Sequence, residues 1–233
     1  MSEARVQILT GRQRGAFITL EGGEGSGKST QIGHLLRTLR EAGIEAIGTR
    51  EPGGSSGAEI LRKILLSGCV AHLGPAAEAI LFSAARIDHI DNTIKAALAA
   101  GTFVVSDRFA DSTRAYQGAR GQLDPRFLRA LERITLDGVR PDLTLILDLP
   151  VSEGLARAAA RRSDGEAPDR FEREDLSFHE SLRATFLSIA VAEPARCVVI
   201  DAGGAEEEVA HTIFETVSSR LIAPAVVKQA RHG

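Results

Sequence analysis

The segment GGEGSGKS at positions 22–29 matches the pattern GxxxxGK[ST] in full, and it constrains the fold more than any other feature of the chain. The apolar run 16–21 before it is typical of a buried strand, and an amphipathic helix is expected from about Lys28 to Ala42. Between a strand and a helix, the pattern predicts a phosphate-binding loop whose glycines let backbone N–H groups turn inward. Lys28 is expected to neutralise the β- and γ-phosphates of a nucleotide, and Ser29 to hold Mg²⁺.

Strand-like and helix-like segments alternate along the rest of the chain. Further strands are expected at 44–49, 102–106, 143–147 and 197–200, and further helices at 58–66, 76–100, 125–136 and 205–221. Apolar strands separated by helices predict a parallel sheet with helices on both faces. The predicted fold is therefore α/β: a P-loop three-layer αβα sandwich with a five-stranded parallel sheet and a mobile lid. Residues 15–222 are expected to form a single domain, with a flexible leader at 1–14 and a flexible tail at 223–233.

The composition argues against nucleic acid and membranes as partners and against a framework of disulfides or metal sites. A net charge of -3 over 233 residues argues against a protein that coats nucleic acid. No apolar run approaches the ~20 residues that span a bilayer, and the N-terminus lacks the features of a secretion signal. Two cysteines, Cys69 and Cys197, are too few for a disulfide framework, and the histidines show no metal-binding spacing. We expect a cytoplasmic protein with no nucleic-acid and no membrane partner.

Basic residues next to strand ends indicate a second anion site. TREPGG at 49–54 follows the second expected strand, and SDR at 106–108 follows the third. Phe82 and Arg86, four residues apart in an expected helix, share one face. Each feature alone is explained by a turn, a capping ion pair or a solvated arginine. Together they predict a basic site with an aromatic platform, which suits a phosphoryl acceptor that is itself a nucleotide.

Two other classes of nucleotide-binding protein also use a phosphate-binding loop: GTPases, and nucleotide-dependent switches or assembly ATPases. The segment DAGG at 201–204 fits the DxxG pattern of GTPase switches, but no NKxD base-reading motif follows. A strand end turning into a helix explains this segment better. A nucleotide-dependent switch or assembly ATPase would use the loop without an acceptor, and the second basic site with Phe82 weighs against it.

With these segments in this order, the chain resembles the thymidylate kinases, specifically the bacterial form, over residues 16 to about 220. The segments that carry the resemblance are EGGEGSGKST, TREPGG, LFSAAR, VVSDRF, DSTRAYQG and DLTLILDLP. The resemblance implies an ATP- and Mg²⁺-dependent transfer of the γ-phosphoryl group of ATP to dTMP, giving dTDP and ADP. It also implies a homodimer. A kinase of another monophosphate, such as dUMP, UMP or CMP, is the alternative.

The resemblance further implies roles for single residues. Phe82 stacks on the base and Arg86 hydrogen-bonds its edge, while Tyr116 packs against the 2′ position of the deoxyribose. Glu24 meets the acceptor 3′-hydroxyl, although a solvent-exposed loop acid would look the same in the sequence. The implied acceptor-binding residues are Arg50, Phe82, Arg86, Arg108, Ser112, Thr113, Tyr116 and Gln117. The implied ATP-binding residues are Gly22, Gly23, Glu24, Gly25, Ser26, Gly27, Lys28, Ser29 and Thr30, and Asp107 joins Ser29 near Mg²⁺. The implied catalytic residues are Lys28, Glu24 and Arg108 with Arg161 and Arg162.

Residues 157–175 form the most charged stretch, with five arginines and six acidic residues among 19. Such a run is usually a solvated surface loop, and Gly165 and Pro168 interrupt any helix through it. The resemblance favours a lid that delivers an arginine, because Gly25 stands where some relatives have one inside the phosphate loop. The candidates are Arg161 and Arg162, with Arg157 behind them and Arg170 in the closing segment. The choice among them stays open, as do the adenine contacts, for which the loop after Asp201 is the candidate.

Overall fold

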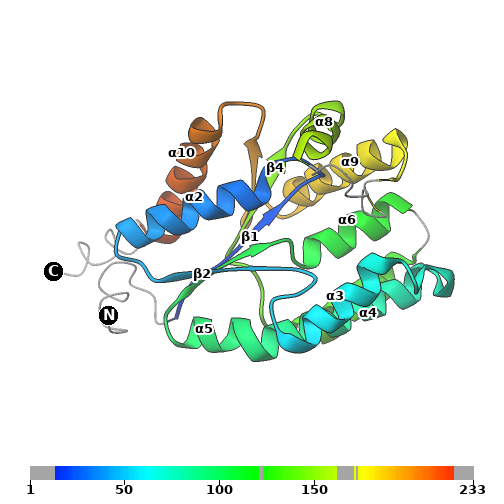
Figure 1. Cartoon of the computed structure of the whole chain (residues 1–233). Helices are drawn as coiled ribbons and strands as arrows, with labels where there is room; N and C mark the ends of the chain where they lie inside the picture. The colour runs from blue at the N-terminus through cyan, green and yellow to red at the C-terminus, as the bar shows by residue number, and fades with distance from the viewer. Residues whose placement is uncertain (1–13, 121–122, 162–170, 172, 223–233) are drawn as a thin grey trace.

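The computed structural model describes residues 14–120, 123–161, 171 and 173–222 (Figure 1). Five strands form one sheet in the order β2-β3-β1-β4-β5, and every adjacent pair is parallel. The strands are β1 (Phe17–Glu21), β2 (Ala46–Arg50), β3 (Phe103–Asp107), β4 (Leu143–Asp148) and β5 (Cys197–Asp201). The predicted five-stranded parallel sheet is confirmed, and each strand lies within two residues of its expected bounds.

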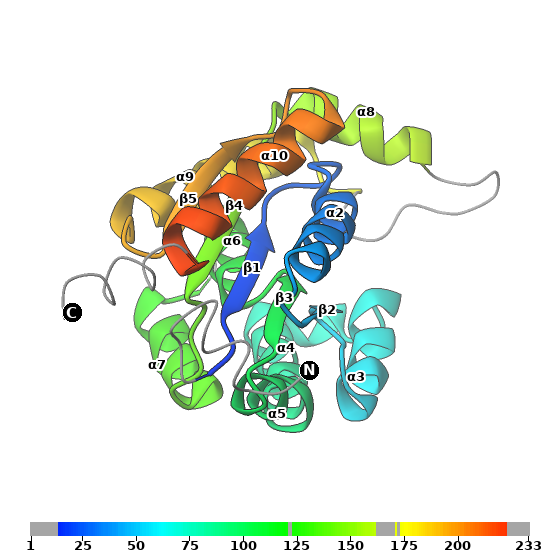
Figure 2. The same cartoon turned by 90° about the vertical axis from the view of Figure 1, so that its left-hand side faces the viewer.

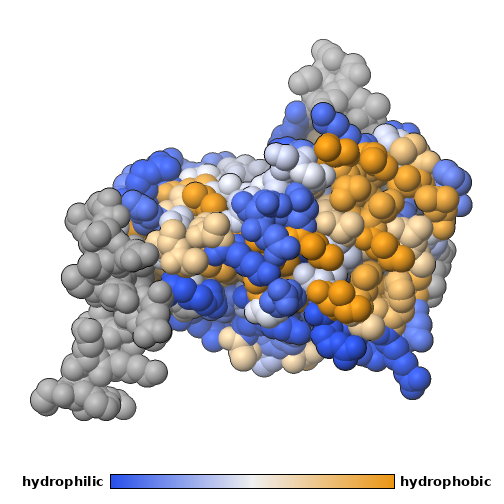
Figure 3. Space-filling view, turned by 90° about the horizontal axis from the view of Figure 1, so that it is seen from below, coloured by the Kyte–Doolittle hydropathy of each residue, from blue (hydrophilic) through white to orange (hydrophobic). Residues whose placement is uncertain are grey.

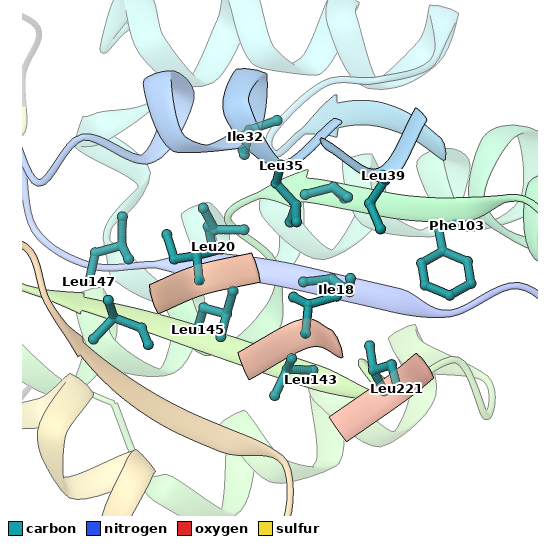
Figure 4. Close-up of a cluster of buried hydrophobic side chains, with 14 of the residues drawn as sticks. Ile18, Leu20, Ile32, Leu35, Leu39, Phe103, Leu143, Leu145, Leu147 and Leu221 are labelled. Carbon is teal, nitrogen blue, oxygen red and sulfur yellow. The ribbon is translucent and has the colours of Figure 1, made fainter. Parts of the chain in front are cut away.

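Helices cover both faces of this sheet, as the alternation predicted (Figure 2). The helices are α2 (Lys28–Glu41), α3 (Ser56–Ser67), α4 (Pro75–His89), α5 (Lys95–Ala99), α6 (Ala110–Arg120), α7 (Pro125–Leu136), α8 (Val151–Arg161), α9 (Leu176–Ala192) and α10 (Glu206–Val217). On one face, Ile18 and Leu20 of β1 share a core with α2 and α10 (Figure 4). On the other face, Phe17 packs with residues of α5 and the segment before it, and α6 and α9 pack over β4 and β5. Because side chains alternate along a strand, Glu21 points to the same face as Phe17.

The single helix expected at 76–100 is divided. A π-helical segment, Ile90–Ile94, separates α4 from α5. Ile90, Ile94 and Leu98, which are spaced four residues apart, lie in one buried cluster against the sheet. The helix expected at 205–221 likewise passes into a π-helical segment, Ser218–Ile222. The sequence analysis did not assign α6, α8 or α9.

The expected lid, leader and tail lie partly or wholly outside the residues that the structure describes. Residues 157–161 of the expected lid form the last turn of α8, whereas 162–170 and 172 lie outside the described residues. Of the expected leader only Arg14 is described, and its guanidinium binds the Asp142 carboxylate at 2.9 Å. The expected tail lies outside the described residues as well. None of the helices in the described part of the chain has the length and apolar character that a bilayer span requires.

A buried ion-pair network fixes α6 to the sheet. Asp111, in the first turn of α6, is 3% exposed. Its carboxylate accepts hydrogen bonds from Arg196, just before β5, at 2.6 and 2.8 Å, and from Arg114 at 3.0 Å. Arg196 also donates to the Thr144 hydroxyl of β4 at 2.7 Å. Because a buried charge that loses its partner is costly, this network holds the start of α6 firmly over β4.

Candidate active site

The phosphate-binding loop joins β1 to α2 and encloses the Lys28 ammonium group. Lys28 Nζ donates to the carbonyl oxygens of Gly22 at 3.2 Å and Gly23 at 2.8 Å, and to Ser26 Oγ at 3.3 Å. Gly27 caps α2 with φ 90°, a conformation that favours glycine. Burial and the positive charge of Arg108 lower the pKa of Lys28 to about 8. A cation and the N-terminus of α2 therefore converge where phosphate oxygens would lie.

Two glycines bring the loop against α8. Gly25 has φ 68°, and a Cβ built there would lie 1.8 Å from the carbonyl oxygen of Gly154 in α8. A Cβ on Gly154 would in turn lie 2.4 Å from the carbonyl oxygen of Glu24. Real Cβ atoms do not approach backbone so closely, so neither position has room for a side chain. The absence of an arginine at position 25 thus has a steric cause in the packing of α8.

One cavity of about 340 Å³ opens at the carboxyl ends of the strands. Its wall combines the loop residues Glu24 to Ser29 with most of the residues expected for the acceptor, namely Arg50, Phe82, Arg86, Arg108, Ser112, Thr113 and Tyr116. Asp107 and Arg161 line the same cavity. Gly22 and Gly23 line a smaller one behind the loop, and Thr30 is exposed on α2. Gln117 lies on α6, but its side chain is outside the described part of the structure, as is Arg162.

Glu24 is held at the centre of this cavity wall. Its Oε1 accepts hydrogen bonds from Arg108 Nη2 at 2.7 Å and from the Tyr116 hydroxyl at 2.5 Å. Burial raises the pKa of this carboxyl, but the charges of Arg108 and Lys28 and the Tyr116 hydrogen bond lower it to about 2. The alternative of a solvent-exposed loop acid is therefore wrong, because the Glu24 side chain is only 17% exposed.

Arg86 is locked by a chain of buried hydrogen bonds. Its Nε donates to Glu51 Oε2 at 2.7 Å, and its Nη2 donates to Thr113 Oγ1 at 2.9 Å. Glu51 Oε1 lies 3.0 Å from His89 Nδ1, and His89 Nε2 lies 2.7 Å from Thr49 Oγ1. Arg86 is 4% exposed and lines the cavity, and these hydrogen bonds hold its guanidinium in place. The sequence analysis missed Glu51 and His89, although His89 follows Arg86 by three residues on the same helix.

The opening of the cavity carries two further arginines. Arg50 is 55% exposed and binds Glu59 of α3 at 3.1 Å. Arg62 of α3, which the sequence analysis did not single out, donates to the Pro52 carbonyl oxygen at 2.7 Å and lines the cavity. Arg62 and Leu66, which also lines the cavity, are four residues apart, so helical spacing within the segment expected at 58–66 was the available signal.

Ser29 and Asp107 lie side by side, as a shared metal ligand set requires. Ser29 Oγ donates to Asp107 Oδ2 at 2.8 Å, joining the start of α2 to the end of β3. Hydroxyl and carboxylate oxygens are hard ligands of the kind that Mg²⁺ prefers, so these residues fit that ion. Elsewhere in the described chain, His34, Glu206 and Glu207 also bring possible ligand atoms together, but on the surface and with Arg37 donating to His34 Nδ1 at 2.7 Å.

Of the candidate lid arginines, Arg161 lies at the cavity and Arg157 lies at the loop after β5. Arg161, the last residue of α8, lines the cavity. Arg157 instead donates to the Ala202 carbonyl oxygen, in the loop after β5, at 3.0 Å. Phe171 lies with its ring centroid 5.1 Å from that of Tyr116 and 6.5 Å from that of Phe82. Arg170 lies outside the described residues.

Comparison with known proteins agrees with this geometry. The family model described as thymidylate kinase matches residues 20–213. The chain belongs to the thymidylate kinase family. A protein named thymidylate kinase from Bradyrhizobium diazoefficiens is 54% identical over 222 residues, covering 95% of this chain and 96% of that relative. A protein of the same name from Nitrobacter winogradskyi is 55% identical over 220 residues, covering 94% of this chain and 95% of the relative.

Membership of the thymidylate kinase family confirms the resemblance drawn from the six sequence segments. Those segments are far apart in the chain, yet the structure gathers residues from five of them around one cavity. The sixth, DLTLILDLP, contains β4, which pairs with β1 beneath the phosphate-binding loop. The chain is therefore a phosphotransferase.

Proposed function

We propose that this protein transfers the γ-phosphoryl group of ATP to the 5′-phosphate of dTMP, giving dTDP and ADP. The observation that carries the proposal is the single cavity, which has the phosphate-binding loop on one wall and Phe82, Arg86 and Arg108 on the other. Membership of the thymidylate kinase family supports both substrates. The two phosphate chains would then meet near Arg108, between the two walls.

On the donor side, the loop N–H groups and Lys28 bind the β- and γ-phosphates of ATP. Ser29 and Asp107 would hold Mg²⁺, which neutralises phosphate charge when it is bound. Lys28 keeps its proton at neutral pH, since a pKa of about 8 leaves the ammonium form in excess. Arg161 adds positive charge at the transferring group from the lid side of the cavity. These groups stabilise the transition state by electrostatics that are already in place.

On the acceptor side, Phe82 stacks on the thymine ring and Arg86 hydrogen-bonds its edge. Arg50 and Arg108 bind the acceptor phosphate, and Ser112, Thr113 and Gln117 line the base and sugar pocket. The acceptor oxygen is already anionic at neutral pH, so it needs no strong general base. Catalysis then depends on positioning and charge stabilisation, which is the usual pattern for phosphoryl transfer.

A panel of monophosphates tests the proposed reaction. We expect ADP formation with dTMP, measured in a coupled spectrophotometric assay with ATP, to exceed that with dUMP, UMP and CMP. It should also depend on Mg²⁺, because Ser29 and Asp107 would hold that ion. Faster turnover with UMP or CMP would assign a different monophosphate kinase activity. ATP hydrolysis that is independent of every acceptor would favour a switch or assembly ATPase.

Arg161 is expected to supply transition-state charge. Replacing it in Arg161→Ala should lower kcat about tenfold and leave both KM values nearly unchanged, because the neighbouring Arg162 keeps part of the positive charge. Single-turnover kinetics would measure the chemical step directly. Arg157→Ala is the comparison, and we expect a smaller change in kcat because Arg157 is engaged with the Ala202 carbonyl. A larger effect in Arg157→Ala than in Arg161→Ala would reverse the assignment.

Tyr116 is expected to exclude ribonucleotides with its ring. Tyr116→Ala should lower the preference for dTMP over ribothymidine 5′-monophosphate about tenfold, since removing the ring makes room for the 2′-hydroxyl. The ratio of the two kcat/KM values measures this preference. Tyr116→Phe keeps the ring and loses only the hydrogen bond to Glu24, so the preference should be retained. An unchanged ratio in the alanine variant would refute the role of Tyr116.

We also propose that two copies of the chain pair through α3 and α4. Four apolar side chains there are at least 40% exposed: Ile60 of α3, Leu73 of the segment between the two helices, and Ile80 and Ile87 of α4. Figure 3 shows apolar side chains gathered on the side of the molecule where these helices lie. We expect sedimentation to give about twice the 24.8 kDa chain mass, and Ile80→Glu to give the single mass, because a charge in an apolar contact is costly. Val191→Glu, on an exposed position of α9, is the control that should remain paired.

The expected cytoplasmic location is kept as part of the proposal. Its support is that both cysteines are free thiols, with Cys69 exposed and Cys197 buried. Reduced thiols are the usual state in a reducing compartment. Fractionation of cells that carry a tagged copy would test the location, and recovery outside the cytoplasm would contradict it.

A further inference from the structure

Glu21 is a buried carboxylate for which the proposed reaction has no role. It is the last residue of β1, directly before the phosphate-binding loop, and it is 0% exposed. Its two oxygens are both used in contacts with the chain that follows β3. Oε1 accepts from the Phe109 backbone N–H at 2.8 Å, and Oε2 accepts from the Ser112 hydroxyl at 2.6 Å. Burying a carboxylate costs free energy unless its oxygens accept hydrogen bonds, and here both oxygens do so.

The two contacts of Glu21 come directly after a strained residue. Arg108 has φ 68°, a left-handed conformation that is uncommon for residues other than glycine. Its backbone N–H donates to the Leu20 carbonyl oxygen at 3.0 Å, which ties the start of this turn to β1. Phe109, the next residue, is tied to Glu21. Strained backbone persists only where the surroundings hold it. Here β1 holds both Arg108 and Phe109, and Ser106 of β3 donates to the Arg108 carbonyl oxygen at 2.8 Å.

Glu21 also reaches the Arg108 side chain through one intermediate. Ser112 Oγ, which donates to Glu21, accepts a hydrogen bond from Arg108 Nη1 at 3.2 Å. The same Nη1 donates to the Gly22 carbonyl oxygen at 3.1 Å, and Nη2 binds Glu24. The guanidinium is thus held on one side by the phosphate-binding loop and on the other by the pair Ser112 and Glu21.

We propose that Glu21 is a positioning residue for the acceptor phosphate, which holds the Arg108 turn through Phe109 and the Arg108 guanidinium through Ser112. This inference rests on the proposed function, in which Arg108 binds that phosphate. Glu21 itself touches neither nucleotide site, since it does not line the cavity. Its effect on the reaction passes entirely through Arg108 and Ser112.

The charges around Glu21 give acceptor binding a pH dependence that can be measured as a second test of this role. Burial and the neighbouring Asp111 carboxylate raise the pKa of Glu21 to about 7. The hydrogen bonds from Ser112 and Phe109 and the charge of Arg108 act in the opposite direction and lower this pKa, but they are outweighed. The ionisable groups that face it are Asp111 and Arg108 near the start of α6 and Lys28 of α2. Below pH 7 the protonated carboxyl can still accept from Phe109 and donate to Ser112. Above pH 7 it adds a negative charge beside Arg108, which opposes the binding of an anionic acceptor.

Two substitutions at Glu21 separate positioning from mere folding. Glu21→Ala leaves the Phe109 N–H and the Ser112 hydroxyl without their partner and releases the turn. We expect kcat/KM for dTMP to fall about a hundredfold, while KM for ATP changes less than about threefold. Glu21→Gln can accept from Phe109 and donate to Ser112, so kcat/KM for dTMP at pH 6 should stay within about threefold of the wild-type value. The ratio of wild-type to Gln-variant kcat/KM should then fall about threefold to tenfold between pH 6 and pH 8.5, because only the wild type gains a charge.

Thr19→Val is the matched control, because Thr19 lies two residues earlier on the same face of β1, and its buried hydroxyl pairs with Thr144 Oγ1 at 2.9 Å rather than with Phe109 or Ser112. It should lower stability and leave the KM for dTMP unchanged. Normal acceptor kinetics in Glu21→Ala would overturn the proposal. If Glu21→Ala does not fold, the Gln variant decides, and a ratio that stays flat with pH would also overturn it.

A readout that does not depend on turnover separates this proposal from the proposed function. Hydrogen exchange of the Phe109 amide should be faster in Glu21→Ala than in the wild type and in Thr19→Val. An unchanged exchange rate would overturn the positioning role. If the wild-type protein fails to phosphorylate dTMP, the proposed function is wrong, whereas the exchange experiment still tests whether Glu21 holds the turn.

Discussion

Lys28→Ala should lower turnover of ATP and dTMP at least about a thousandfold, with the fold intact. The ammonium group is the buried cation of the phosphate-binding loop, bonded to the Gly22 and Gly23 carbonyl oxygens and to Ser26 Oγ. Without it, the loop loses its own cation, and less of the charge on the transferring phosphoryl group is compensated. The coupled assay gives turnover, and circular dichroism shows whether the variant folds.

Lys63→Ala is the matched control for this prediction. Lys63 is an exposed lysine on α3, so its removal changes the net charge equally without touching the loop. We expect its turnover to stay within about twofold of the wild-type value, as for most exposed surface substitutions. Near-normal turnover in a clean preparation of Lys28→Ala would contradict both the role of the loop and the proposed reaction.

Gly25→Arg should lower turnover at least about a hundredfold. The new Cβ would lie 1.8 Å from the Gly154 carbonyl oxygen, so the loop and α8 must move apart. Glu24 is the neighbouring loop residue, and its contacts with Arg108 and Tyr116 would shift with it. The added positive charge therefore cannot replace the lid arginine in this chain.

The control for this prediction is Gly33→Ala. Gly33 lies in α2, and a Cβ there meets no atom within 4 Å. Replacing a helical glycine by alanine should raise the free energy of unfolding by up to about 1 kcal/mol and leave turnover unchanged. If Gly25→Arg kept full activity, particularly together with Arg161→Ala, the contact between the loop and α8 would not be required for catalysis.

Much of this architecture could be predicted because its signals are local. The phosphate-binding loop is eight consecutive residues between a strand and a helix, and the apolar runs that form the five strands are continuous. Arg50, Arg86 and Arg108 could be predicted to share one site, because they lie in short segments next to strand ends or on one helix face, and all three line the cavity. Such signals need no knowledge of which elements become neighbours.

The residues that the sequence analysis missed act through contacts between distant segments. Glu51 holds Arg86 across 35 positions, and Glu21 holds Phe109 across 88. Neither pairing has a spacing that periodicity could detect. The π-helical segment at 90–94 was also missed, since the helix expected at 76–100 ran through it without a break. The steric role of Gly25 likewise depends on α8, which the sequence analysis did not assign.

The single cavity has a consequence for inhibitor design. The residues proposed to bind the donor and those proposed to bind the acceptor line one continuous space of about 340 Å³, so one compound can be designed to contact both sets. A molecule that carries a thymidine-like end on Phe82 and a polyphosphate end in the loop would join two weak binding events into one. Each end raises the effective concentration of the other, provided that the linker matches the distance between them. Selectivity over other nucleotide enzymes would then come from the combination of ends rather than from either end alone.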